Sequence, residues 1–364
     1  MKRLLCIVNT MDTGGAETFL MKVYRALDKS KYQIDFCISS KTPGFYDEEI
    51  KSLGGHFFFA PLKSVDPIGN FVGIYKLVKS QKYMSVMRMS AHALSVLELL
   101  AAKMAGAEKV ILRSTNTQNA GGRKSRLLHS MFAFMPKIVP NVKIAPSVAA
   151  AEFEFGKRAV AKGKGRIINN AIPLDQYVFS EETRASVRQE YGIENKFVIG
   201  NVGRFSEQKN HLFLIDIFAE IVKENQNAIL MLVGDGELRA KIEDKIEKLG
   251  LQGNVILTGV KSNVNELLMS MDVIAFPSLY EGMPNVIIEA QATGLNCVIS
   301  DTITKEANVT GCVKYLGLAE GAAKWAEMIN NYKTTGDRSA GANILKQKGY
   351  DIFDVANQFA DIAF

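Results

Sequence analysis

Two glutamates lie on either side of an expected helix start in the segment 276–294, FPSLYEGMPNVIIEAQATG. Glu281 precedes Gly282, and Pro284 is a residue that favours the first helical position, so Glu289 would lie one turn inside the helix. The unpaired N–H groups of a helix start suit a phosphate or a sugar edge, and a carboxylate accepts hydrogen bonds from two neighbouring hydroxyls, as on a ribose. We therefore interpret this segment as part of a nucleotide-sugar site.

Two cations that suit a diphosphate follow another strand-like run. They are Arg204 and Lys209, in the stretch NVGRFSEQKN. Arginine can bind two phosphate oxygens at once, whereas lysine acts as a point charge, and such fixed cations stabilise the charge that grows on a departing diphosphate. We predict this role for both residues, the alternative being two solvated loop cations. His211 is a candidate for supporting the same loop.

Glycines occupy two further turns that follow strands. Gly14 and Gly15 come between the first strand and a helix, where they would let backbone N–H groups approach a phosphate or sugar closely. Their spacing is not GxGxxG, which argues against a nicotinamide site. Glu17 is expected to be a helix-start acid that complements the helix dipole. Gly234 allows a turn after a later strand, which we interpret mainly as a structural role.

Both halves of the chain alternate short apolar runs with longer amphipathic ones. This rhythm is typical of βαβ units and a doubly wound parallel sheet, in which ligands bind at the carboxyl ends of the strands. Strands are expected at 4–9, 32–38, 56–60, 85–89, 109–113 and 142–145, and then at 197–202, 228–234, 254–259, 272–277 and 296–300. The segment 169–180 breaks the rhythm and indicates a connection between two domains.

Composition indicates a folded protein of the cytoplasm. No run of about 18 uninterrupted apolar residues is present, so we expect no spanning helix. The start, MKRLLCIVNT, has only a short apolar run and is typical of a first strand, not of a signal peptide. The four cysteines lack CxxC spacing, which favours buried free thiols in a reducing compartment.

The segment PSLYEGMPNVIIEAQATG as a whole resembles the signature of the retaining family-4 glycosyltransferases, and the likeness is closest to bacterial enzymes that build capsular polysaccharides and exopolysaccharides. The resemblance to this family covers nearly the whole chain and is strongest from Ile199 to Glu306. The family has the α/β GT-B fold, in which two Rossmann-like doubly wound domains face a cleft and the last helix crosses back to the first domain. We therefore expect an acceptor-side domain at 1–170, a linker at 171–180, a nucleotide-sugar domain at 181–348 and a C-terminal crossover helix at 349–364.

The resemblance implies a role for each matching residue. Arg204 and Lys209 would stabilise the diphosphate without a metal ion or other cofactor, and Glu281 would contact the hydroxyls of the transferred sugar, which makes these three the expected catalytic residues. Glu289 would bind the ribose, and the backbone around Val260 would bind the base. The expected donor-binding residues are Gly14, Gly15, Arg204, Lys209, Gly234, Val260, Glu281, Gly282, Met283, Pro284, Asn285, Val286 and Glu289.

The first domain departs from the family pattern. Many relatives have histidines at the ends of two strands there, at places where this chain has Arg88, Arg113 and Thr115. His92 follows slightly later and is open to two interpretations, a structural histidine or one that reaches the site. The acceptor-side candidates are Arg113, Thr115, Asn116 and His92.

Charge is distributed unevenly along the chain. Residues 1–170 contain 26 Lys and Arg and 12 Asp and Glu, a balance of +14, whereas residues 171–364 contain 18 and 26, a balance of −8; the two add up to the net +6. This asymmetry indicates that the first half faces something anionic. Nucleic acid is one possibility, although no recognised nucleic-acid module appears, and the resemblance to the family favours an anionic membrane surface or a lipid-diphosphate acceptor. The basic, amphipathic segment 121–137 is either a helix in the membrane interface or a helix that covers the sheet.

We expect a retaining, metal-independent glycosyltransferase of surface polysaccharide synthesis. It would move a hexosyl or N-acetylhexosaminyl group from a nucleotide-diphosphate donor, a UDP-sugar, to a lipid-linked saccharide. Two alternatives stay open: a sugar-nucleotide epimerase of the same fold, and a donor-binding subunit that scaffolds an assembly complex. The epimerase would act on the donor alone, and the scaffold would bind a nucleotide without turning it over.

Overall fold

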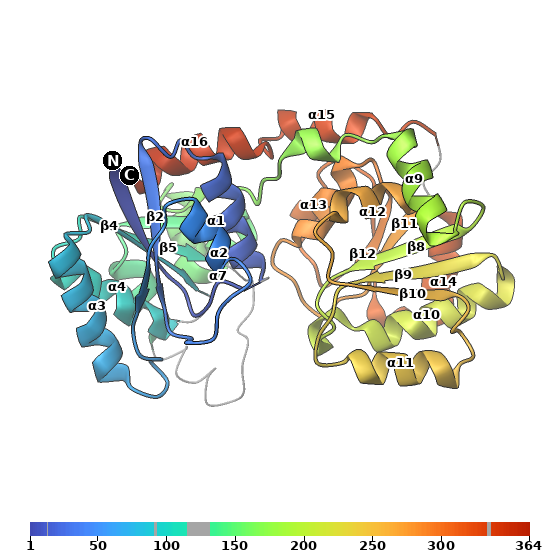
Figure 1. The fold of residues 1–364 in the computed structure, drawn as a ribbon, viewed down its shortest axis with the longest axis horizontal. Coiled ribbons are helices and arrows are strands. Elements are labelled where there is room, and N and C mark those ends of the chain that lie inside the picture. The colour runs from blue at the N-terminus through green and yellow to red at the C-terminus, as the bar shows by residue number, and fades with distance from the viewer. Residues whose placement is uncertain (13, 91–92, 115–131, 333–335) are drawn as a thin grey trace. The chain divides into compact units, whose positions relative to one another are not determined.

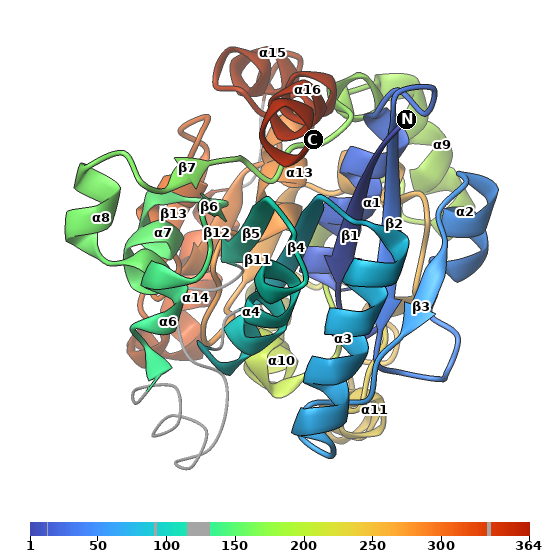
Figure 2. The same ribbon diagram turned by 90° about the vertical axis from the view of Figure 1, so that its left-hand side faces the viewer.

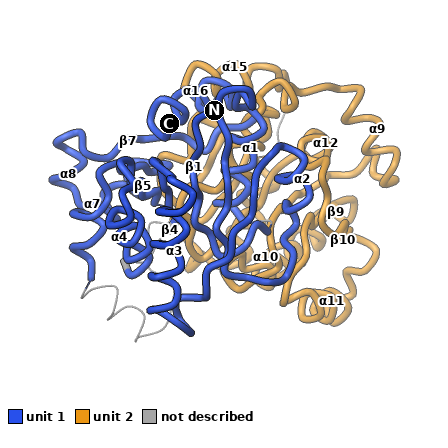
Figure 3. The backbone as a smooth tube through the Cα atoms, turned by 60° about the vertical axis from the view of Figure 1, so that its left-hand side comes forward, with its two compact units in different colours: residues 1–172, 349–364 blue, residues 173–348 orange. Residues whose placement is uncertain are grey.

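A computed structural model describes residues 1–12, 14–90, 93–114, 132–332 and 336–364. The chain forms two compact units (Figure 3): unit 1 contains Met1–Ile172 and Gly349–Phe364, and unit 2 contains Pro173–Lys348. The first boundary falls inside the segment 171–180 that we expected to be a linker, part of which is the short 3-10 helix η2 (Leu174–Tyr177).

The described part of unit 1 contains a seven-stranded parallel sheet with the order β3-β2-β1-β4-β5-β6-β7. The strands are β1 (Lys2–Ile7), β2 (Tyr32–Ile38), β3 (Phe57–Phe59), β4 (Ser85–Ser90), β5 (Lys109–Ser114), β6 (Val142–Ala145) and β7 (Arg166–Ile167). The helices are α1 (Gly15–Ala26), α2 (Asp47–Ser52), α3 (Pro67–Gln81), α4 (Val96–Met104), α6 (Met135–Ile138), α7 (Val148–Phe155), α8 (Lys157–Ala161) and α16 (Ile352–Ala363), with the 3-10 helix η1 (Ala93–Ser95). The strand order reverses between β1 and β4: β2 and β3 follow β1 on one side, and β5, β6 and β7 follow β4 on the other.

The two faces of this sheet bury alternate residues of each strand. Leu4 packs with α1 and α16 on one face, and Leu5 packs with α3, α4 and α7 on the other. Figure 2 shows α3 and α4 side by side over the near face. The strands therefore consist of nearly continuous apolar runs, which is why their positions could be predicted.

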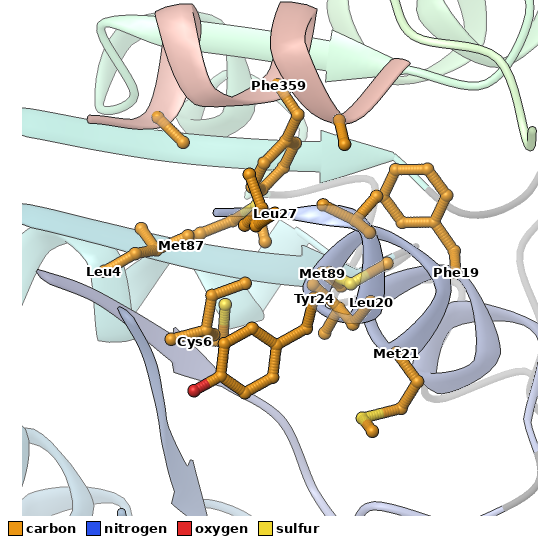
Figure 4. Packing of buried hydrophobic residues seen from close by; sticks show 14 of the residues in the cluster. Leu4, Cys6, Phe19, Leu20, Met21, Tyr24, Leu27, Met87, Met89 and Phe359 are labelled. Atoms are coloured by element: carbon orange, nitrogen blue, oxygen red, sulfur yellow. The ribbon is translucent and has the colours of Figure 1, made fainter. Parts of the chain in front are cut away.

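The C-terminal helix α16 completes the core of unit 1. Figure 4 shows Phe359 reaching into a cluster that includes Leu4, Phe19 and Met87, and the rings of Phe19 and Phe359 meet edge to face with centroids 6.3 Å apart. Where the chain returns to unit 1, Ile172 N donates to Tyr350 O and Ile352 N donates to Ile172 O. The predicted return of the last helix to the first domain is confirmed.

Unit 2 contains, in its described part, a six-stranded parallel sheet with the order β10-β9-β8-β11-β12-β13. The strands are β8 (Phe197–Val202), β9 (Ala228–Val233), β10 (Val255–Gly259), β11 (Val273–Phe276), β12 (Cys297–Ser300) and β13 (Val313–Leu316). The helices are α9 (Glu181–Tyr191), α10 (His211–Glu224), α11 (Arg239–Lys248), α12 (Val264–Ser270), α13 (Asn285–Ala292), α14 (Gly321–Asn331) and α15 (Ala340–Gln347), and the 3-10 helix η3 (Glu207–Lys209) precedes α10 (Figure 1). Here the order reverses between β8 and β11.

Each strand expected from the sequence is present, and two observed strands were missed. β7 has only two residues, both exposed, and β13 is a four-residue edge strand, so neither contains an apolar run long enough to be recognised. The expected start of α13 needs a correction of one residue, because Pro284 is the N-cap and the first helical residue is Asn285. In the part of the chain that the structure describes, no helix combines the length and the apolar character needed to span a membrane.

Phe359 should be essential to the stability of unit 1. Truncating this buried ring by Phe359→Ala should lower the free energy of unfolding by about 3–5 kcal/mol. Phe353→Ala, on the exposed side of the same helix, should change it by less than about 0.5 kcal/mol. Urea unfolding followed by circular dichroism measures both, while fluorescence of the single tryptophan, Trp325, reports on unit 2. Equal unfolding midpoints for the two variants would contradict this prediction.

Candidate active site

The strand order of unit 2 places two loops side by side. β8 and β11 are neighbours in the sheet, and they flank the point at which the order reverses. Because the carboxyl ends of parallel strands meet at one edge, the loops after Val202 and after Phe276 start next to each other, at the position where α/β sheets bind ligands. The first loop contains Arg204 and Lys209, and the second contains Glu281.

Backbone and side-chain amides form hydrogen bonds between these two loops. Leu279 N donates to Gln208 O (2.8 Å), and Gln208 Nε2 donates to Tyr280 O (2.9 Å). Asn210 Nδ2 donates to Pro277 O (3.1 Å), and Asn210 itself has the left-handed backbone conformation (φ +57°) that turns the chain into α10. The residue between Gln208 and Asn210 is Lys209, so the hydrogen bonds fix its backbone against the second loop.

Lys209 and Glu281 form an ion pair, with 2.6 Å between Lys209 Nζ and Glu281 Oε1. Their side chains are only 18% and 11% exposed. Lys209 Nζ also lies 4.7 Å from the centre of the Phe276 ring. Partial burial limits screening by water, so the ammonium group is held in one place with a substantial local field. Two of the three expected catalytic residues are therefore in direct contact.

Arg204 is placed differently. Its side chain is 75% exposed, and Arg204 Nε donates to Glu237 Oε2 (3.1 Å), a residue in the loop after β9. An exposed ion pair of this kind contributes little to stability, so its exchange for a phosphate costs little. The structure thus pairs Lys209 firmly with Glu281 and leaves Arg204 in a contact that a ligand can replace.

The loop after β9 supports the backbone around Arg204. A Cβ at Gly234, whose φ is +141°, would lie 2.1 Å from Gly203 O, and a Cβ at Gly236 would lie 2.6 Å from Phe205 O. Only glycines allow the two loops to approach this closely. The structural role expected for Gly234 fits this packing, and its contact with a donor stays a prediction.

His211 is fully buried at the first position of α10. Its ring lies edge to face against Phe205 with centroids 4.7 Å apart, and neither ring nitrogen has a hydrogen-bond partner among the described residues. Burial, with a smaller contribution from the Lys209 charge, lowers the pKa of His211 to about 4. The neutral ring therefore supports the loop by packing, and it does not titrate near pH 7.

Helix α13 begins at the second loop without a side-chain cap. Pro284, its N-cap, makes no capping hydrogen bond through its side chain, which has no polar atom. Asn285 Oδ1 and Ser278 Oγ are buried polar atoms without a hydrogen-bond partner in the described part of the chain. Buried polar atoms are normally paired, so both have capacity for a ligand or water. The region 283–286 therefore combines a helix start with one buried polar atom, Asn285 Oδ1, that can still accept a hydrogen bond.

Glu289 lies one turn inside α13 and is nearly buried. The buried Tyr177 hydroxyl of η2 donates a hydrogen bond to this carboxylate; burial is the largest cause of a raised Tyr177 pKa, and the charge and hydrogen bond of Glu289 raise it further. The tyrosine was not foreseen from the sequence, because it comes from the expected linker. Val260 is exposed directly after β10, and its role with Glu289 in nucleoside binding stays a prediction.

In unit 1, Arg113 is buried rather than presented to solvent. Its guanidinium stacks on Phe19, 3.6 Å from the ring centre, and donates from Nη2 to Asn170 Oδ1 (2.6 Å). Burial lowers the pKa of Arg113 to about 9. The side chain therefore supports packing between β5 and α1, and its expected contact with an acceptor is untested. The other acceptor-side candidates, Thr115, Asn116 and His92, lie outside the described residues, as does most of the segment 121–137.

Gly14 and Gly15 lie at the start of α1. Gly14 is the N-cap, and a Cβ there would lie 2.1 Å from Glu17 Oε2, whereas a Cβ at Gly15 would meet no atom within 4 Å. Burial is the main cause that raises the pKa of Glu17. Glu17 thus occupies the first turn, as expected, and folds back against Gly14.

A pocket of about 410 Å³ follows β1 and β2 in unit 1. It is lined by Asn9, Thr10, Asp12, Ser39, Ser40, Thr42, Pro43 and Leu62. Sequence reasoning missed it, although one signal was present: each of two neighbouring strands is followed at once by a cluster of hydroxyl, amide and carboxyl side chains.

Comparisons with known proteins identify the family. The family model for glycosyl transferases group 1 matches residues 183–329. A putative glycosyltransferase, EpsF, from Bacillus subtilis is 33% identical over 357 residues, which cover 96% of this chain and 93% of that protein. A UDP-Gal:alpha-D-GlcNAc-diphosphoundecaprenol alpha-1,3-galactosyltransferase from Escherichia coli is 23% identical, over 79% of this chain and 76% of the relative.

Solved structures show the same fold. The crystal structure of Anabaena Alr3699/HepE in complex with UDP-glucose aligns with a TM-score of 0.79 and 19% identity, over 99% of each chain. The alignment extends over both parallel-sheet units, so the expected GT-B fold is confirmed. Together with the full-length similarity to EpsF, it shows that this chain belongs to the group 1 glycosyltransferases and has the GT-B fold.

Proposed function

We propose that this glycosyltransferase moves a sugar from a UDP-sugar to a lipid-linked saccharide, with retention at the anomeric carbon and without a metal ion. The observation that carries the proposal is the 2.6 Å pair of Lys209 and Glu281, held beside the start of α13 where the strand order of unit 2 reverses. A fixed cation, a fixed carboxylate and a helix start are the groups that a sugar diphosphate requires.

The proposed reaction uses these groups on one face of the sugar. The bond between the anomeric carbon and the diphosphate oxygen breaks, the acceptor oxygen bonds to that carbon from the same face, and the departing diphosphate takes the acceptor's proton. Lys209, Arg204 and the first N–H groups of α13 stabilise the diphosphate charge. Glu281 accepts hydrogen bonds from hydroxyls of the transferred sugar, and its contact with Lys209 keeps it oriented.

The donor and acceptor classes are supported by the relatives. The Escherichia coli relative is named for a UDP-linked galactose donor and a diphosphoundecaprenol acceptor, and the Anabaena structure contains UDP-glucose. A chain with a basic first half suits an acceptor that carries a diphosphate. We also propose that the protein works in the cytoplasm, at the membrane surface where such an acceptor resides.

The stereochemistry and the metal requirement can be tested in one assay. With a panel of UDP-sugars, a lipid-linked saccharide and excess EDTA, the product should keep the anomeric configuration of the donor, as measured by NMR of the anomeric proton. An inverted product, or activity that returns only with a divalent cation, would exclude the proposed mechanism. Conversion of the donor in the absence of any acceptor would indicate an epimerase.

Lys209 should bind the diphosphate independently of its partner Glu281. UDP binds without a transferred sugar, so Glu281→Gln should keep UDP affinity within about threefold. Adding Lys209→Ala to that variant should weaken UDP binding at least about tenfold and leave uridine binding unchanged. Arg204→Ala should weaken UDP binding in the same direction, whereas Arg239→Ala, which removes another surface cation of unit 2, should not. Calorimetry measures each affinity, and equal UDP affinities for the single and double variants would contradict the role of Lys209.

Glu289 should recognise the ribose hydroxyls. Wild-type protein should be stabilised more by UDP than by 2′,3′-dideoxy-UDP, because only the ribose offers donors to the carboxylate. Glu289→Ala should bind both nucleotides with similar affinity, and Tyr177→Phe, which removes the hydrogen bond to the carboxylate, should reduce the preference only in part. Thermal-shift titrations give the comparison. If Glu289→Ala keeps the full preference for UDP, the ribose is bound elsewhere.

A further inference from the structure

The pocket after β1 and β2 in unit 1 has the chemistry of a saccharide site. Six of its eight lining residues have hydroxyl, amide or carboxyl side chains, which can bind sugar hydroxyls, and Pro43 and Leu62 add apolar surface. Ser39 N and Ser40 N donate to Asn9 O (3.1 and 3.0 Å), so the loops after β1 and β2 are joined at the pocket. A volume of about 410 Å³ suits one or two sugar rings.

A buried ion pair holds one wall of this pocket. Arg88 Nη2 donates to Asn9 Oδ1 (3.1 Å), and Arg88 Nη1 donates to Ile7 O (2.8 Å). Arg88 Nε lies 2.6 Å from Glu98 Oε2, and both of these side chains are buried. Asn9 is therefore oriented before any ligand arrives, which lowers the entropy cost of binding.

Large apolar side chains are exposed beside the pocket, in residues 59–68, which we call the apolar segment. Phe59, Leu62, Val65 and Ile68 are all exposed, and Val65 and Ile68 reach 81% and 76%. Single exposed apolar residues are ordinary, but four within ten residues indicate a binding surface.

The backbone of the apolar segment is fixed by hydrogen bonds. Ala60 N donates to Ile38 O (3.0 Å), and Val65 N donates to Leu62 O (2.9 Å). The buried Asn70 donates from Nδ2 to Pro61 O (2.7 Å). The exposure of these side chains is therefore a property of an ordered loop and of the first turns of α3.

The pocket and the apolar segment adjoin. Leu62 belongs to both, since it lines the pocket and is also exposed. Lys41, between the pocket residues Ser40 and Thr42, has its Nζ 5.4 Å from the centre of the Phe59 ring. A pocket with polar groups, an exposed cation and an apolar surface thus adjoin one another, as the saccharide, the diphosphate and the lipid chain adjoin in a lipid-linked acceptor.

We propose that unit 1 binds the acceptor as an amphiphile: the saccharide occupies the pocket, Lys41 lies against the diphosphate, and the first isoprene units of the lipid chain cover Leu62, Val65 and Ile68. This inference rests on the proposed function for the class of acceptor. It adds the residues that bind each part and a specificity for the lipid chain itself.

The test compares two probes that differ only in the lipid. Farnesyl-diphosphate-linked N-acetylglucosamine should bind the full-length protein at least about tenfold more tightly than the methyl-diphosphate compound, because buried methylene groups add affinity. The triple variant Leu62→Ser, Val65→Ser and Ile68→Ser should reduce this preference to about twofold or less. Met84→Ser, an exposed apolar residue at the opposite, amino end of β4, is the matched control and should keep it. Thr42→Val, in the pocket, should weaken both probes alike.

Further measurements separate the possible outcomes. The triple variant should keep the wild-type melting temperature and UDP affinity, which shows that it is folded and that its donor site is intact. A triple variant that keeps the full preference for the farnesyl probe would overturn the inference. A triple variant that keeps this preference and loses only its binding to acceptor-free anionic vesicles would also overturn it, because the apolar segment would then contact the membrane and not the acceptor. If the wild-type protein prefers the farnesyl probe but transfers no sugar from any UDP-sugar, the proposed function is excluded and this inference still holds.

Discussion

The structure of the candidate site in unit 2 depends on the meeting of two parallel strands at the point where the strand order of their sheet reverses. Because β8 and β11 are neighbours, the loops that leave their carboxyl ends can exchange backbone hydrogen bonds, and the ion pair of Lys209 and Glu281 is a consequence of that exchange. The glycine packing after β9 and the burial of His211 support the same loop from behind. A change in strand order would separate these groups even if every residue were kept.

Sequence reasoning could find the residues that follow strands, and it could not find those that meet through the tertiary fold. Arg204, Lys209 and Glu281 were recognisable because each comes shortly after an apolar run, and their motif resembles a known family. The hydrogen bond of Tyr177 to Glu289 joins residues 112 positions apart, and no local pattern marks it. The burial of Arg113 was also unforeseen, since a charged residue at a strand end normally suggests solvent or ligand.

The two cations of the proposed diphosphate site are held to different degrees. Lys209 is partly buried and paired, so its position is set before a donor binds, whereas Arg204 is exposed and its partner Glu237 is exposed as well. A preorganised charge stabilises a transition state without reorganisation, and an exchangeable one adapts to the ligand. Unit 1 shows the same contrast: Asn9 is fixed by a hydrogen bond from the buried Arg88, whereas Lys41 is exposed.

The division of unit 1 between the two ends of the chain has a consequence for biosynthesis. Its sheet and α1 are translated before unit 2, but α16 and the buried ring of Phe359 are translated after unit 2. Unit 2 is contiguous and can fold as soon as it emerges, whereas unit 1 must wait with an uncovered apolar face on α1 and β1. Until α16 has been synthesised, the nascent first half therefore exposes apolar surface that can aggregate.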